Sequence, residues 1–90
     1  MTVLVHRGAE REFDRLPPDV RKRIVRALEE FHDTGRGDVR HIRGVLWALR
    51  VGVYRITYGK NTDILVVGVD HRKHAYIPER VESLEKRLQV

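Results

Sequence analysis

The spacing of apolar positions changes along the chain, and the change divides it into a helical part and a strand-like part. The first part carries one apolar stripe at intervals of three and four residues, which predicts a helix packed on a core. This helix is expected to begin at Pro18, which suits a first turn, and to end at Gly35. The residues of the stripe are Val20, Ile24, Ala27, Leu28 and Phe31.

Two shorter elements are predicted before this helix. The β-branched run from Thr2 to His6 favours a strand. Residues 8–16 favour a short helix that Pro17 ends, because proline cannot continue a helix interior.

After a loop over residues 36–40 the pattern becomes strand-like. Glycine at position 52 and the segment 59–62 supply turns between the predicted strands. The run Ile64 to Val69 is apolar on both faces, which is typical of a central strand. From Pro78 a short C-terminal helix is predicted, with Val81, Leu84 and Leu88 on one side. The three strands are predicted at Leu46 to Val51, Val53 to Tyr58 and Asp63 to His71.

This order predicts an α+β fold over residues 1–90 as a single domain. Two N-terminal helices would pack on one face of a mainly antiparallel four-stranded sheet, in the order β-α-α-β-β-β, with the short C-terminal helix following. The result would be a sandwich of two layers. The other sheet face, or part of it, would then be polar or concave.

The composition limits the chemistry and the cellular location that we expect of the protein. The chain has 90 residues and no cysteine, so disulfide and thiolate chemistry are excluded. It lacks an apolar run near the ~20 residues that a membrane span needs. A small domain without disulfides favours a cytoplasmic location or a stabilising partner.

The net positive charge is concentrated in the middle of the sequence. The formal net charge is +5. Between Arg40 and Tyr76 seven basic residues stand against only two acids, and this difference equals the whole excess. A localised basic segment of this kind favours a polyanion-binding surface, with nucleic acid as its partner. The basic residues are Arg40, Arg43, Arg50, Arg55, Lys60, Arg72 and Lys73.

Strand periodicity predicts that three of these arginines converge. With Val51-Gly52 as a two-residue hairpin loop, Ala48 opposes Arg55, and Arg50 and Arg55 project from one face as diagonal neighbours. If Tyr58 pairs with Asp63, Arg72 falls on the same face. Guanidinium groups repel one another, so a fold has little reason to gather them without an anion, and their planar fork suits phosphate oxygens.

Two segments resemble the RelE/ParE toxin superfamily. They are LRVGVYRITY, residues 49–58, and HRKHAY, residues 71–76, which follow a helical hairpin with a Leu16-Pro17-Pro18 break. The resemblance covers nearly the whole chain, and the two segments at their mutual spacing are its most specific part.

The resemblance implies a RelE-type toxin of a type II toxin–antitoxin system. Such toxins are mRNA interferases, which cut mRNA on the ribosome through attack of a ribose 2′-hydroxyl on the adjacent phosphate, without a metal or cofactor. The implied partners are a cognate antitoxin and mRNA on the ribosome, with no membrane. By their positions in the sequence, Arg50, Arg55 and Arg72 match family residues that contact the scissile phosphate. Tyr76 matches a family tyrosine that takes part in catalysis or in base stacking.

Proton transfer needs a group other than arginine, and the candidates are His71 and Tyr76. The predicted catalytic set is therefore Arg50, Arg55, Arg72, His71 and Tyr76. The predicted nucleic-acid-binding set is Arg43, Arg50, Arg55 and Lys73. A metal site is not predicted, since no cysteine or acidic cluster completes a ligand set.

One departure from the family pattern keeps a catalytically weakened member of the family open as an alternative. Many relatives have a basic residue two positions before Arg50, where this chain has Ala48. The alternatives are a ParE-like toxin that inhibits DNA gyrase and a nucleic-acid-binding member with weakened catalysis. The C-terminal helix is a candidate contact for the antitoxin.

Overall fold

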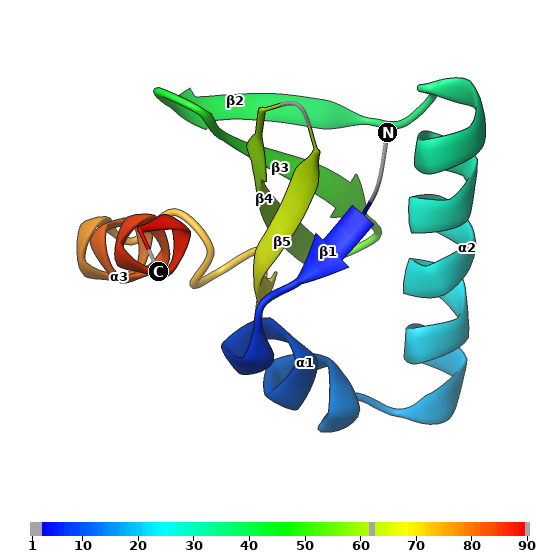
Figure 1. Ribbon diagram of the computed structural model, residues 1–90. Helices are drawn as coiled ribbons and strands as arrows, with labels where there is room; N and C mark the ends of the chain where they lie inside the picture. The colour runs from blue at the N-terminus through cyan, green and yellow to red at the C-terminus, as the bar shows by residue number, and fades with distance from the viewer. Residues whose placement is uncertain (1–2, 62, 90) are drawn as a thin grey trace.

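The computed structural model describes residues 3–61 and 63–89, and Figure 1 shows the arrangement of their helices and strands. The sheet lies in the middle, with helices on both of its sides. Thr2 and Thr62, which were included in a predicted strand and a predicted turn, lie outside the described residues. The elements are β1 (Val3–Val5), α1 (Arg7–Asp14), α2 (Pro18–Thr34), β2 (Val39–Arg43), β3 (Leu46–Val51), β4 (Tyr54–Lys60), β5 (Ile64–His71) and α3 (Pro78–Leu88).

The predicted helices are confirmed. Helix α2 begins at Pro18 and is capped by Gly35, whose φ of 74° is a left-handed conformation that glycine adopts without strain. The Gly35 amide donates to the carbonyl of Phe31, as in a common C-terminal cap. The stripe of α2 buries Ile24 and Phe31 against the sheet. Within the described residues, no helix combines the length and apolar character that crossing a membrane requires.

The sheet has five strands, in the order β1-β5-β4-β3-β2, so the predicted count of four was wrong. Residues 39–43 form an edge strand, β2, that had been assigned in part to a loop. Its side chains are exposed except for a half-buried Ile42, so the segment lacks the apolar alternation that marks a strand in sequence. Residues 39–43 form a strand because their backbone pairs with that of β3. Strand β5 is central and buried, as predicted, with β1 parallel to it.

The strand registers differ from the predicted ones. Val51 pairs with Tyr54, so the hairpin loop is Gly52-Val53 rather than Val51-Gly52. Tyr58 pairs with Val66 instead of Asp63, because β4 continues to Lys60, which pairs with Ile64. An irregularity between Thr57 and Tyr58 also shifts the register by one residue. A hydrophobic pattern fixes which face a residue occupies but leaves the turn position open by a residue.

A third layer replaces the predicted sandwich of two layers. Helices α1 and α2 cover one sheet face, and α3 covers part of the other (Figure 1). Val81 and Leu84 of α3 pack against Leu46 and Val67. Gly68 allows this approach, because a Cβ there would lie only 2.5 Å from a Leu84 methyl carbon.

A charged network joins the layers at one end of the sheet. Arg80 of α3 donates to Glu12 of α1 at 2.7 Å and to Asp70 of β5 at 3.0 Å, and Arg87 donates to Glu12 at 3.1 Å. Burial raises the pKa of Glu12, but the hydrogen bonds from Arg87 and Arg80 outweigh it and leave that pKa below its usual value. Burial raises the pKa of Asp70, which shares Arg80 with Glu12.

Candidate functional site

Two of the predicted arginines lie on the second sheet face, the one that α3 partly covers. Arg50 of β3 and Arg55 of β4 form a directly opposed pair, with Asp70 next in the same row on β5. Residues opposed in this way point to one face, with Cα atoms about 5 Å apart. The register differs from the predicted one, yet the two guanidinium side chains share a face as predicted.

Arg55 is largely buried, with 9% of the residue exposed. Its Nη1 donates to the carbonyl oxygens of Gly52 and Tyr54, each at 2.9 Å, so the side chain braces the hairpin turn. Its Nε is buried without a hydrogen-bond partner. Such a donor is costly unless water or a ligand satisfies it.

Arg50 is more exposed than Arg55 and has an acidic side chain beside it. Its Nε lies 3.3 Å from an Asp38 carboxylate oxygen, and both side chains are well exposed. The Arg50 amide also donates to the Asp38 carbonyl. An exposed pair of this kind contributes little to stability, so a phosphate can compete with Asp38 for the guanidinium.

Tyr76 lies against the same region, in the turn that precedes α3. The guanidinium carbon of Arg40 lies 5.0 Å from the centroid of the Tyr76 ring. The Tyr76 hydroxyl is buried and has no hydrogen-bond partner. Sequence reasoning had selected Tyr76 but not Arg40, because its strand was not predicted. Arg40 is the cross-strand neighbour of Ala48, the position where a basic residue had been noted as missing.

Thr57 was also missed. It is fully buried on β4, two residues after Arg55 and therefore on the same face, and its Oγ1 has no partner. A threonine within a run of apolar residues has no distinguishing signal in sequence. Arg55, Thr57 and Tyr76 thus each contribute a buried polar atom without a partner.

His71 lies on the other side of the sheet. It pairs with Tyr54, and the two rings make an edge contact at 5.9 Å. Its Nδ1 accepts a hydrogen bond from the Lys73 amide at 3.1 Å. The alternation of strand β5 places Asp70 on the arginine face and His71 on the face of α1 and α2. The structure therefore does not bring His71 to Arg50 and Arg55.

Arg72 and Lys73 are exposed in the turn after β5. The Arg72 amide donates to the carbonyl of Val53 at 2.7 Å, which holds its backbone beside the hairpin loop. The backbone of this turn therefore lies beside the hairpin loop that joins β3 and β4. Arg43 is placed differently, since it forms an ion pair with Glu85 of α3.

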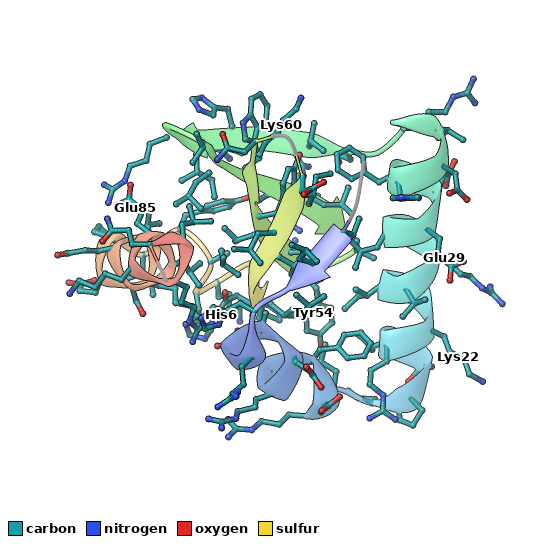
Figure 2. The ribbon with its side chains drawn as sticks, viewed as in Figure 1. His6, Lys22, Glu29, Tyr54, Lys60 and Glu85 are labelled. Carbon is teal, nitrogen blue, oxygen red and sulfur yellow. The ribbon has the colours of Figure 1, made fainter. Side chains whose placement is uncertain are left out.

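Figure 2 shows the side chains around the sheet, with Glu85 on the α3 side and Lys22 and Glu29 on the outer face of α2. The arrangement can bind an anion through guanidinium groups and place a phenol beside it. In the part of the chain that the structure describes, no three His, Cys, Asp or Glu residues are grouped to hold a metal ion.

Comparisons with sequences and with solved structures give different results. No protein-family model matches the chain. No curated protein matches it either.

Solved structures of toxin–antitoxin complexes do match. A chain of the RelB-RelE antitoxin-toxin complex from Methanococcus jannaschii is 28% identical, with a TM-score of 0.69, over 83% of this chain and 96% of that one. A chain of the RelBE2 complex from Mycobacterium tuberculosis is 29% identical, with a TM-score of 0.53, over 79% and 96%. A chain of the archaeal RelE-RelB complex from Pyrococcus horikoshii OT3 shares the fold at 21% identity and a TM-score of 0.70, over 82% and 97%. These structural neighbours support a RelE-type toxin.

Proposed function

We propose that this chain is the toxin of a toxin–antitoxin pair and acts as a ribosome-dependent mRNA endonuclease. The observation that carries the proposal is the direct pairing of Arg50 and Arg55 on one sheet face, beside the row whose Arg40 contacts the Tyr76 ring. Arg55 and Tyr76 each hold a buried polar atom without a partner. The structural likeness to RelE toxins supports the first part of the proposal, a toxin of a toxin–antitoxin pair.

The proposed reaction needs no cofactor. A ribose 2′-hydroxyl gives up its proton and its oxygen attacks the adjacent phosphorus, the bond from phosphorus to the 5′-oxygen breaks, and the departing 5′-oxygen takes up a proton. The products are a 2′,3′-cyclic phosphate and a 5′-hydroxyl end. Arg50 and Arg55, with Arg72 from the turn after β5, stabilise the extra negative charge on the phosphorane. In this proposal the Tyr76 hydroxyl transfers the proton.

The partner that neutralises the toxin is proposed to be an antitoxin protein. An apolar groove of about 380 Å³ lies between α1, α2 and the sheet, and Val5 and Val25 at this groove are 49% and 40% exposed. We place antitoxin contact here. The apolar side of α3, the contact favoured from sequence, already packs on the sheet. The groove is lined by Val5, Ala9, Glu10, Phe13, Asp14, Ile24, Val25, Leu28, Ile56, Val66 and Val69.

The deciding experiment is to add the purified protein to programmed ribosomes and map the ends of the transcripts. We expect cuts at defined sites within mRNA, 5′-hydroxyl ends, and no cutting of the same mRNA without ribosomes. Intact mRNA together with gyrase-linked DNA breaks would contradict the proposal and favour a ParE-like toxin.

A further inference from the structure

Arg40 occupies a place in the sheet that brings it to the candidate site. It pairs with Ala48, which pairs with Thr57, which pairs with Gly68, so these four residues form one row across four strands. The row is adjacent to the row that contains Arg50 and Arg55, and its side chains project from the same face.

The row gives Arg40 room to reach over the sheet. A long side chain at position 48 would project between Arg40 and Thr57, whereas the methyl group of Ala48 leaves that space to neighbouring side chains. Ala48 is nevertheless fully buried, so other side chains cover it. Arg40 itself forms none of the ion pairs found among the described residues.

The contact that Arg40 does make is with the Tyr76 ring. The guanidinium carbon lies 5.0 Å from the ring centroid, within the range in which a cation is attracted to an aromatic face. Tyr76 lies in the turn over residues 72–76, outside the regular sheet. A side chain on such a segment needs contacts to fix its orientation, and the hydroxyl supplies none.

We propose that Arg40 is a positioning residue that holds the Tyr76 ring, and with it the hydroxyl, in the orientation required at the anion site of Arg50 and Arg55. Only the expected effect on cleavage rests on the proposed function; the role of Arg40 in holding the Tyr76 ring does not. It also assigns Tyr76 a role through its hydroxyl rather than as a stacking platform, because Arg40 already covers one face of the ring.

The test combines a measurement on the purified protein with a measurement of cleavage. Fluorotyrosine is incorporated at the three tyrosines of the chain, and the fluorine resonance of Tyr76 is assigned with Tyr76→Phe. Arg40→Ala removes the cation, and Arg40→Lys retains it without the planar group. Arg36→Ala is the matched control, since Arg36 is exposed in the loop after α2. The Tyr54 and Tyr58 resonances report whether each variant is folded.

In Arg40→Ala the Tyr76 resonance should move toward the position of an exposed tyrosine while the Tyr54 and Tyr58 resonances stay in place. Arg40→Lys should give an intermediate shift, and Arg36→Ala none. On ribosomes, kcat of Arg40→Ala should fall on the order of 10- to 100-fold with a much smaller change in KM, and Arg40→Lys should recover part of it.

Two results would overturn the proposal. One is an unchanged Tyr76 resonance in Arg40→Ala. The other is a loss of kcat in Arg36→Ala equal to that in Arg40→Ala, which would mean that only net charge matters. If the wild-type protein cuts no mRNA, the proposed function fails, and the fluorine spectra alone then decide whether Arg40 positions Tyr76.

Discussion

Arg50 and Arg55 are directly opposed across the hairpin of β3 and β4, so two like charges share one row of one sheet face. Like charges in this arrangement destabilise a sheet. Asp38 compensates Arg50 in part, and the hairpin carbonyls compensate Arg55. An anion bound between them would relieve the remaining repulsion, which is why the pair is the centre of the proposed site.

The first prediction concerns Arg55. Arg55→Ala should reduce mRNA cleavage by about 10²–10³-fold, because it removes a preorganised cation from the developing charge. It should also lower the free energy of unfolding by about 1–3 kcal/mol, since the hairpin carbonyls lose their donor. Single-turnover cleavage and urea denaturation measure the two effects. Arg36→Ala is the control, and full cleavage by a folded Arg55→Ala protein would remove Arg55 from the site.

The second prediction separates stability from activity at Tyr76. Tyr76→Phe should leave the free energy of unfolding unchanged within about 1 kcal/mol, or raise it, because the deleted hydroxyl is buried without a partner. Cleavage should fall by about 10²–10⁴-fold if this hydroxyl transfers the proton. A Phe variant that cleaves normally would show that the phenol oxygen has no chemical role.

The third prediction concerns His71, which sequence reasoning paired with Tyr76 as a proton-transfer candidate. Because His71 contacts Tyr54 on the opposite face, His71→Gln should keep kcat within about threefold of the wild type, well below the ~10²-fold cost of losing a general acid or base. The pH profile of kcat should also keep its shape. A loss as large as that of Tyr76→Phe would mean that the turn after β5 rearranges on the ribosome.

The fourth prediction tests the antitoxin groove. Val25→Asp introduces a charge at its apolar rim and should weaken antitoxin binding by at least about tenfold, or 1.4 kcal/mol. Val45→Asp is the matched control, since Val45 is 43% exposed and does not line the groove. Titration calorimetry with the antitoxin measures both. Equal affinities for the two variants would place the contact elsewhere.

The fifth prediction follows from the lowered pKa of Glu12. An acid whose pKa is lower in the folded state adds stability above its unfolded pKa and loses it as the pH falls through the folded value. Glu12→Gln should therefore cost about 2 kcal/mol at neutral pH, where it also leaves Arg87 and Arg80 without their shared carboxylate. The difference from the wild type should shrink as the pH falls below the usual value of 4.5.

Urea denaturation across this pH range measures the effect, with Glu10→Gln as the control on the exposed side of α1. The raised pKa of Asp70 acts in the opposite direction, since ionising Asp70 costs more in the folded than in the unfolded chain. Both proteins keep Asp70, whose pKa Glu12 helps to raise and which shares Arg80 with it, so the difference reports Glu12 together with its effect on Asp70. A pH-independent difference would mean that Glu12 has the same pKa folded and unfolded.

The sequence by itself determined the helices, the central strand and the common face of Arg50 and Arg55. These features depend on local periodicity and on proline and glycine at element ends, as at Pro18 and Gly35. The shared face survived a wrong hairpin loop, because Arg55 lies opposite Arg50 in one register and diagonal to it in the other, and side-chain alternation places both on one face either way.

Tertiary structure alone decided the rest. Strand β2 has no apolar alternation and exists through its pairing with β3, so Arg40 could not be assigned to the site from sequence. The bulge in β4 and β5 and the turn after β5 set the positions of Tyr76 and His71. Arg43 looked equivalent to the other arginines until α3 brought Glu85 beside it. Each of these outcomes depends on contacts between residues distant in the chain, which no local pattern encodes.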